Sequence, residues 1–267
     1  MDITSFQQFQ KIIYDKSGIA LGPGKIALVS SRVRKRMHFL GIQDHRLYLQ
    51  RVMEDENGEE IIQLLDVIST NVTYFYRQPD HYDFISHKLR HWMQKGQRRF
   101  RFWSTACATG EEPYSLAMKL LDSAADETVD MKILATDISL SVLQKGVEGV
   151  YEMEKLKTVP PEFRERFFNP CPTGKEPCYQ IKPAIKQMVL FKHLNLSAPP
   201  FPMRGPFDAI FCCNVLIYFD DSVRKRLLHD INRLLRPGGY LFIGYSENIV
   251  RLIDDFKSVE PAIYQKI

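Results

Sequence analysis

The stretch R-F-R-F-W-S-T-A-C-A-T-G-E-E-P-Y-S, residues 99–115, decides the fold. From Arg99 to Thr105, polar and apolar side chains alternate, which is typical of a β-strand. Small residues up to Gly110 then predict a turn, and a helix should follow, with Pro113 in its first turn, where proline costs little. The two glutamates before Pro113 suit the positive end of a helix dipole. This order predicts the strand–turn–helix unit of an α/β protein.

Similar units continue toward the C-terminus. Short apolar runs that predict buried strands lie at residues 131–135, 189–191, 207–213 and 240–244. We expect a helix over 223–235, ended by Pro237-Gly238-Gly239, and an antiparallel edge pair within 256–266. Strands that alternate with helices predict a doubly wound, mostly parallel sheet.

The N-terminal third has a different pattern. Apolar residues recur at helical spacing, as at Phe6, Phe9, Ile12 and Ile13, and breaks that contain glycine separate the repeats. We find no strand pattern there. The sequence therefore predicts a helical bundle over 1–90 and an α/β domain over 91–267.

Residues 146–188 interrupt the α/β rhythm. This proline-rich segment is too long for an ordinary loop. We expect a small inserted β-subdomain, with a helix near 161–168 and a hairpin around Thr173-Gly174.

Composition narrows the class of protein. The 267 residues are 45% hydrophobic and 25% charged, which suits a globular protein with a core. No run approaches the roughly 20 apolar residues of a membrane helix, and the N-terminus lacks a signal-peptide pattern, so we expect a cytoplasmic protein without membrane insertion. Five cysteines, an odd number, favour reduced thiols. Cys171 and Cys178 are a weak zinc signal, and we expect no metal site.

The net charge of +4 does not by itself imply nucleic acid. Four basic residues nevertheless lie close together, at Arg32, Arg34, Lys35 and Arg36. Both a solvated helix face and a surface for an acidic partner fit this cluster, and the two readings stay open.

Polar residues follow several of the predicted strands. In an open parallel sheet, ligands bind at the carboxyl ends of the strands. Asp137 ends the second strand, 27 residues after Gly110 (137 minus 110), near the spacing of roughly 20 for a ribose-binding acid. Asn214 follows the run FDAIFCC, and Asn195 follows the third strand. The competing interpretations are that Asp137 caps the next helix and that Asn214 bonds a neighbouring loop.

Several catalytic patterns are missing. There is no H-E-x-x-H, no G-x-S-x-G and no Walker lysine after Gly110. Hydrolase and phosphoryl-transfer functions are therefore disfavoured. An acid and amides at strand ends without a phosphate loop suit a nucleoside ligand that lacks a pyrophosphate, such as S-adenosylmethionine.

A longer series of motifs is more specific. STNVTYFYR (69–77), STACATGEEPYSLAM (104–118), ATDIS (135–139), FDAIFCCNVLIYF (207–219) and LLRPGGYLFIGYSEN (234–248) resemble the motifs of the chemotaxis receptor methyltransferases over essentially the whole chain. The resemblance implies an S-adenosylmethionine-dependent methyltransferase domain behind a helical N-terminal domain. It also implies that γ-carboxylates of chemoreceptor glutamates are esterified.

The resemblance also implies roles for individual residues. Asn71, Thr73 and Arg77 would contact the methionine end of the cofactor, where a guanidinium fork suits the carboxylate. Gly110, Glu111 and Asp137 would contact the amino-group side and the ribose; Asn195, Leu196, Asn214 and Val215 would surround the adenosyl group. Tyr218 would line the methyl-transfer site, where positioning without a general base is expected. Core packing and capping remain the alternatives for these residues.

Partners follow from the same resemblance. The basic cluster Arg32, Arg34, Lys35 and Arg36 would meet acidic chemoreceptor helices, and residues 170–185 would bind a receptor C-terminal peptide by strand addition. A monomer that binds no nucleic acid is expected. The chain departs from the family pattern at Cys213, Tyr245 and Ala108, where Arg, His and Ser are common.

Two other functions stay open. A nucleic-acid methyltransferase would share the cofactor domain, but the D/N-P-P-Y type of motif is missing. A non-catalytic adaptor that senses S-adenosylmethionine would also keep the ligand residues. Salt-stable label transfer to RNA would favour the first, and tight cofactor binding without any transfer would favour the second.

Overall fold

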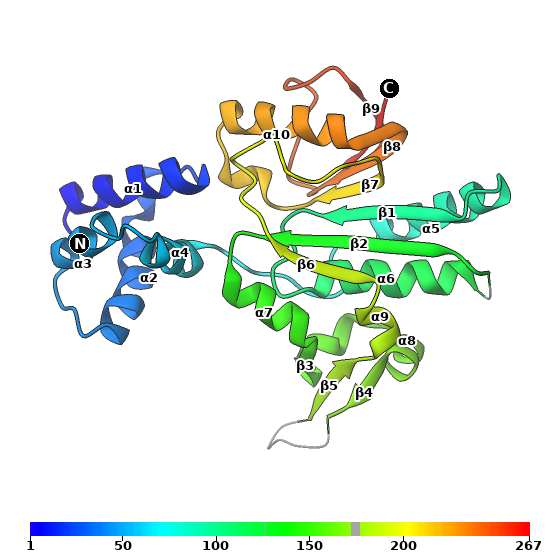
Figure 1. Ribbon diagram of the computed structural model, residues 1–267, viewed down its shortest axis with the longest axis horizontal. Helices are drawn as coiled ribbons and strands as arrows, with labels where there is room; N and C mark the ends of the chain where they lie inside the picture. The colour runs from blue at the N-terminus through cyan, green and yellow to red at the C-terminus, as the bar shows by residue number, and fades with distance from the viewer. Residues whose placement is uncertain (126, 172–176) are drawn as a thin grey trace.

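The computed structural model describes residues 1–125, 127–171 and 177–267 (Figure 1). The N-terminal domain contains α1 (Ile3–Ser17), α2 (Ile26–Phe39), α3 (His45–Met53) and α4 (Glu59–Ile68), with the 3₁₀ turn η1 (Pro23–Lys25) before α2. Their buried apolar side chains, among them Phe9, Ile13 and Tyr48, form a core separate from that of the sheet. The predicted helical bundle is confirmed.

Helix α5 (Pro79–Gln94) connects this bundle to the sheet. Its buried side chains Tyr82, Ile85 and Leu89 join the core formed by the strands and α6 (Glu111–Ala124). The predicted domain boundary at residue 90 thus falls inside a helix that packs on the sheet, and the proposed division at that residue stays a prediction.

The central sheet has the strand order β6-β2-β1-β7-β8-β10-β9. Its strands are β1 (Arg99–Ser104), β2 (Asp130–Asp137), β6 (Val189–His193), β7 (Phe207–Cys212), β8 (Leu235–Ile243), β9 (Phe256–Glu260) and β10 (Ile263–Lys266). The first five in spatial order pair in parallel, and β10 and β9 add an antiparallel edge. The predicted doubly wound, mostly parallel sheet is confirmed. Its order reverses between β1 and β7, which opens a crevice at their carboxyl ends.

Helices cover both faces of the sheet (Figure 1). Phe100 and Phe102 of β1 pack with α5 and α6, whereas Trp103 points to the other face and packs with α10 (Asp221–Leu234). Successive strand residues point to opposite faces, so the apolar residues of β1 serve two cores. Helix α7 (Leu140–Glu148) lies along β2 and β6.

The predicted insert is present as a three-stranded antiparallel sheet. Strand β5 (Cys178–Ile181) lies between β3 (Val150–Glu152) and β4 (Phe168–Pro170). Around them lie η2 (Met153–Thr158), α8 (Pro161–Phe167) and α9 (Pro183–Lys186). The helix expected near 161–168 is confirmed. The expected hairpin tip at Thr173-Gly174, inside the predicted peptide-binding segment 170–185, lies outside the described residues.

One prediction in the sheet is wrong. Pro237-Gly238-Gly239 does not separate α10 from the last parallel strand, because α10 ends at Leu234 and β8 already begins at Leu235. The ladder to β7 pairs Phe207 with Leu235 and then Ala209 with Tyr240, so the residues between them bulge out of β8. Gly238 has a φ of +71°, a conformation that glycine adopts at no steric cost.

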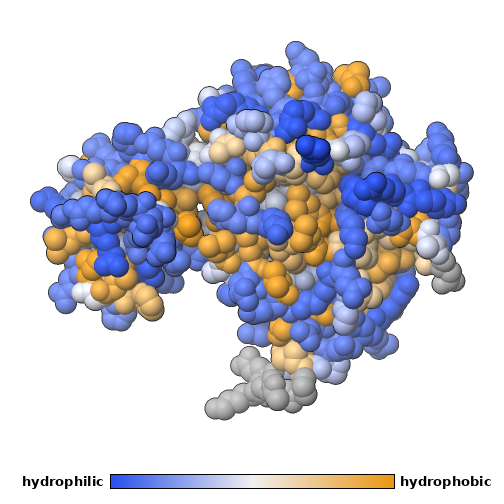
Figure 2. Space-filling model, viewed as in Figure 1, coloured by the Kyte–Doolittle hydropathy of each residue, from blue (hydrophilic) through white to orange (hydrophobic). Residues whose placement is uncertain are grey.

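Two surface properties complete the description. No helix among the described residues is long and apolar enough to cross a membrane. Figure 2 shows apolar side chains gathered over the middle of the molecule, whereas hydrophilic side chains cover most of the helical domain and the outer end of α5.

Candidate cofactor-binding site

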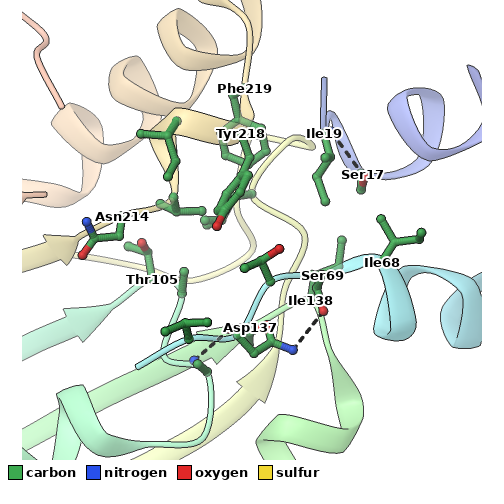
Figure 3. Close-up of a pocket in the computed structure, with 18 of the residues that line it drawn as sticks. Ser17, Ile19, Ile68, Ser69, Thr105, Asp137, Ile138, Asn214, Tyr218 and Phe219 are labelled. Carbon is green, nitrogen blue, oxygen red and sulfur yellow. Dashed lines mark hydrogen bonds between the residues drawn. The ribbon is translucent and has the colours of Figure 1, made fainter. Parts of the chain in front are cut away.

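A cavity of about 350 Å³ lies at the carboxyl ends of β1, β2, β6 and β7, between the sheet and the helical domain (Figure 3). It brings together the predicted residues Asn71, Thr73, Arg77, Asp137, Asn195, Leu196, Asn214, Val215 and Tyr218, together with Arg32. The volume falls in the range of about 300–1,000 Å³ that is usual for small-molecule sites. The strand-end residues and the linker residues, predicted separately, thus share one cleft.

Asp137 ends β2 and faces this cavity while only 7% of its surface is exposed. Its carboxylate accepts hydrogen bonds from the amides of Ala108 (2.9 Å) and Ser139 (3.0 Å). Burial raises the pKa of Asp137 above its ordinary value, although these amide bonds oppose the shift. Ser139, not Asp137, caps α7, because its hydroxyl accepts from the Val142 amide. A carboxylate offers roughly four acceptor positions, so Asp137 keeps about two for a ligand.

The two glutamates in the first turn of α6 have different surroundings. Glu111 is fully buried, accepts from the Thr109 hydroxyl (2.6 Å) and pairs with Lys155 (3.2 Å). Glu112 is the one that lines the cavity, where the Ser104 hydroxyl donates to it (2.7 Å). Burial raises the pKa of Glu112 to about 7. Among the described lining residues, the acid from this turn is therefore Glu112, which the sequence analysis did not single out.

Gly110 also lies outside the cavity lining, and its role is conformational. Its φ is +96°, and an added Cβ would lie 2.9 Å from the Tyr151 hydroxyl oxygen and 3.1 Å from Gly146 Cα. Glycine is required here because the turn approaches α7 and the insert closely. The turn places the Ala108 amide on Asp137, so Gly110 shapes the site without lining it.

The loop after β7 forms another wall. Asn214 adopts a left-handed conformation, with a φ of +59°, and its amide donates to Glu247 (2.9 Å). Glu247 also accepts from the amides of Gly244 (2.5 Å) and Ile217 (3.3 Å), so one carboxylate fixes the loop. Figure 3 shows the Tyr218 ring extending from this loop into the cavity.

The helical domain supplies the remaining wall. Arg77 donates to the carbonyl of Val72 (2.9 Å), and its guanidinium lies 5.8 Å from the centre of the Tyr74 ring. Arg32 donates to the carbonyls of Ile68 and Ser69 and to the Thr70 hydroxyl, so it holds the start of this segment. The Arg77 fork has five N–H donors and uses one of them in this contact, which leaves it able to bind a carboxylate.

Apolar lining residues were largely missed by sequence reasoning. Ile19, Ile138, Leu194 and Phe219 line the cavity with Leu196 and Val215. The sequence could have predicted Ile138 as a lining residue, because it directly follows Asp137. It could not have predicted Ile19, because the antiparallel bridge from Ile19 to Phe219 that brings it there joins positions far apart in sequence.

Comparisons with known proteins now decide the family. Residues 71–264 match the family model described as CheR methyltransferase, SAM binding domain, and residues 4–69 match CheR methyltransferase, all-alpha domain. The chain belongs to the CheR methyltransferase family. S-adenosylmethionine is the ligand of the domain that holds the strand-end residues.

Curated members of the CheR family agree over almost the whole chain. The chemotaxis protein methyltransferase of Borreliella burgdorferi is 36% identical over 263 residues, covering 96% of this chain and 92% of the relative. That of Escherichia coli is 35% identical over 259 residues, covering 97% of this chain and 89% of the relative. Chemotaxis protein methyltransferase 2 of Pseudomonas aeruginosa is also 35% identical, with 97% and 91% coverage.

The basic cluster expected for partner binding in this CheR chain contains two bonded residues and two exposed ones. Arg36 forms two hydrogen bonds with the buried Glu60 (2.9 and 2.8 Å), and Arg32 is bonded to the segment after α4. Arg34 and Lys35 are exposed. Arg34 and Lys35 are thus the two members of the cluster without such contacts among the described residues, and partner binding by all four residues stays a prediction.

The three departures from the CheR pattern lie close to the cavity. Cys213 lines it, and burial raises the pKa of this thiol well above its ordinary value. The Tyr245 hydroxyl donates to Asp80 (2.9 Å), outside the cavity lining. Ala108 contributes its amide to Asp137, a contact that does not depend on its side chain.

Metal chemistry has no support in the described parts of the chain. No group of three or more His, Cys, Asp or Glu residues there is placed to hold a metal ion. Cys171 and Cys178 are free thiols that lie together across β4 and β5.

Proposed function

We propose that this chain transfers a methyl group from S-adenosylmethionine to the γ-carboxylate of specific glutamates on chemoreceptors, in the cytoplasm and as a monomer. The observation that carries the proposal is the convergence of Asp137, Asn214 and Arg77 on one cavity, although they come from β2, the loop after β7 and the linker between α4 and α5. The relatives are named chemotaxis protein methyltransferases, which supports a chemoreceptor as the substrate.

The cavity fits the cofactor in size and donor set. In the proposal, the free acceptor positions of Asp137 take the ribose hydroxyls, and the Arg77 fork takes the methionine carboxylate. Glu112, on the same wall, takes the amino group in place of Glu111. Asn71 and Thr73 add polar contacts on the linker side, while Ile138, Leu196 and Val215 enclose the adenine with Asn195 and Asn214 at its edges.

The chemistry asks little of the side chains. S-adenosylmethionine supplies a methyl group that is already activated by the sulfonium charge. A glutamate side chain has an ordinary pKa near 4.3 and is already ionised at neutral pH, so the enzyme needs no general base. Bound S-adenosylmethionine would give up its methyl group to the carboxylate oxygen and keep the electron pair of the broken carbon–sulfur bond, so the residues of the site would have no proton to move. Alignment of this kind can lower a barrier by roughly 7–11 kcal/mol.

Tyr218 is the residue proposed to position the acceptor. Its ring lines the cavity beside the loop that Glu247 fixes, and its main-chain carbonyl accepts from the Ala20 amide (2.8 Å). The acceptor would approach past the helical domain, where the exposed Arg34 and Lys35 favour an acidic partner. Binding of a receptor peptide at residues 170–185 stays a prediction.

The experiment uses the full chain, methyl-labelled S-adenosylmethionine and the cytoplasmic region of a chemoreceptor. The label on the receptor should be released by alkali, as a methyl ester is. Asp137→Ala should abolish transfer and Arg77→Ala should reduce it strongly at subsaturating S-adenosylmethionine, whereas Arg90→Ala should do neither, because Arg90 is exposed on the far part of α5.

Three results would contradict the proposal. Alkali-stable label on the receptor would exclude a carboxylate acceptor. Salt-stable transfer to RNA would indicate a nucleic-acid methyltransferase. Tight cofactor binding without transfer to any receptor tested would indicate an adaptor that senses S-adenosylmethionine.

A further inference from the structure

A second cavity lies at the opposite end of the sheet from the cofactor site. Its volume is about 380 Å³, and it is lined by Lys88, His91, Trp92, Lys95, Gln97, Arg236, Gly238, Tyr240 and Gln265. These residues come from the C-terminal half of α5 and its C-cap, the turn before β1, the start of β8 and the last strand, β10. In Figure 1 this end of α5 lies farthest from the helical domain.

The described lining of this cavity is basic and contains no carboxylate. Lys88 and His91 are three residues apart and lie on one face of α5, and Lys95, the C-cap residue of this helix, follows His91 by four residues. None of the ion pairs within the described chain involves Lys88 or Lys95. Among the described residues, the acid that pairs with a cation of this lining is the buried Asp208, whose Oδ1 lies 2.8 Å from Arg236 Nε.

Asp208 leaves the guanidinium group incompletely satisfied. Its two oxygens already accept from the Gln97 side chain (2.7 Å) and the Arg101 amide (2.7 Å). Arg236 Nε and Nη2 are buried and have no aligned hydrogen bond among the described residues. The side chain as a whole is 27% exposed, and because Nε and Nη2 are buried, Nη1 is the nitrogen that can reach a ligand in the cavity.

Aromatic rings fix the cations in place. The Arg236 guanidinium lies 4.5 Å from the centre of the Trp92 ring, and the Lys88 ammonium lies 4.9 Å from that of Phe84 and 5.3 Å from that of Tyr240. Such contacts favour a cation over the ring face and reduce the cost of ordering it when a ligand arrives. They also occupy ring faces on which a nucleobase would otherwise stack.

We infer that this second cavity binds a small, multiply charged phosphate anion with the chemistry of a pyrophosphate group. Lys88 and Lys95 supply point charges, and Arg236 adds a third positive charge through its Nη1 group. The site lies outside the cofactor cavity, and the inference does not rest on the proposed function. Both free pyrophosphate and the diphosphate of a nucleotide carry this group.

The test is calorimetric titration of the full chain with pyrophosphate. Lys88→Gln combined with Lys95→Gln should weaken binding at least ten-fold. The matched pair Lys145→Gln and Lys225→Gln removes the same charge from exposed positions of α7 and α10 and should change it less than two-fold. Arg236→Gln removes the third positive charge and should weaken binding several-fold.

Two further titrations separate the sources and the sites. Because the ring faces are occupied, ADP should bind within about two-fold of pyrophosphate, and adenosine should not bind. Saturating S-adenosylhomocysteine should leave pyrophosphate affinity unchanged. Failure of the wild-type chain to bind millimolar pyrophosphate, an equal loss in the control pair, or displacement by S-adenosylhomocysteine would overturn the inference. None of these outcomes depends on methyl transfer.

Discussion

The two walls of the cofactor cavity are built differently. On the sheet side, Asp137 is almost fully buried and is held by two main-chain amides. On the helical side, Arg77 is only partly buried and is held by one carbonyl and the face of an exposed ring. A buried charged group without a partner costs far more than a partly solvated one. The sheet wall is therefore pre-organised, and substitutions there should cost the most ligand affinity. The helical wall contributes fewer fixed contacts, and substitutions there should cost less.

The helical wall depends on contacts that cross between the domains. The Tyr14 hydroxyl donates to Asp220 (2.6 Å), the Asn195 side chain donates to the Lys16 carbonyl (2.7 Å), and Asp66 accepts from Ser139. Most of these groups are exposed or half-exposed, and each contact is worth roughly 0.5–1.5 kcal/mol. Together they keep Arg77 opposite Asp137, although no single one dominates.

The largest expected effect is on the sheet wall. Asp137→Ala should weaken S-adenosylhomocysteine binding at least about 100-fold, because hydrogen bonds to charged groups contribute roughly 1.5–3 kcal/mol each. Calorimetry measures the affinity, and thermal unfolding checks that the variant folds. Asp254→Ala, at an exposed position, is the control. Near-normal affinity in folded Asp137→Ala would show that this carboxylate does not bind the ribose.

On the helical wall the expected loss is smaller. Arg77→Ala should weaken binding of S-adenosylmethionine by about 10–30-fold, the equivalent of roughly 2 kcal/mol for a charged hydrogen-bonded pair. Arg77→Lys should fall between this variant and the wild type, since it keeps the charge without the fork. The same titration with 5′-methylthioadenosine, which has no carboxylate, should give equal affinities for all three proteins. An equal loss for that ligand would mean that Arg77 only supports the linker.

The same two walls show how far sequence alone reaches. Asp137 and Asn214 could be predicted because a buried strand that ends in a polar residue marks the binding edge of a parallel sheet. Glu112 could not be separated from Glu111, because neighbouring residues of a helix point about 100° apart and the phase depends on where α6 starts. The direction of individual side chains is thus harder to predict from the sequence than the strands whose ends form the site.

Contacts between residues distant in sequence explain what else could not be predicted. Nothing in the sequence distinguishes Arg36 from Arg34 and Lys35, yet its guanidinium donates two hydrogen bonds to Glu60 on α4. The bulge in β8 depends on how far β7 extends, which no local pattern in Pro237-Gly238-Gly239 encodes. In both cases the deciding contact is tertiary.

A pH effect should distinguish the two glutamates of α6. The pKa of Glu112 is raised to about 7 by burial, so this group is largely protonated at pH 6 and ionised at pH 8. If Glu112 accepts the ligand amino group, affinity for S-adenosylhomocysteine should rise up to about ten-fold over that range. Glu112→Gln should flatten the rise. The ligand amino group titrates equally in both proteins, so the difference between them reports Glu112.

Stability should change with pH in the opposite direction. The folded protein holds the Glu112 proton more tightly than the unfolded chain does, so stability falls as pH rises from about 4.5 to 7 and then levels off. The expected change is about 1–3 kcal/mol, reduced by the open side of the cavity, and Glu112→Gln should remove it. Glu111→Gln is the matched variant: it disturbs the pair with Lys155 but should keep the pH dependence of affinity. A flat profile in Glu111→Gln would reverse the assignment of the two acids.

The smallest expected effect tests the link between the walls. Asp66 on α4 accepts from the Ser139 hydroxyl and the Ser141 amide (3.2 Å), next to Asp137. Asp66→Asn should weaken cofactor binding by only two- to three-fold, because a half-exposed contact contributes about 0.5–1 kcal/mol. Asp44→Ala, at the N-cap of α3, removes the acceptor of the Arg46 amide and should lower the melting temperature of the helical domain without changing affinity. Equal affinity losses in the two variants would mean that overall stability of the helical domain, and not its contact with the sheet, positions Arg77.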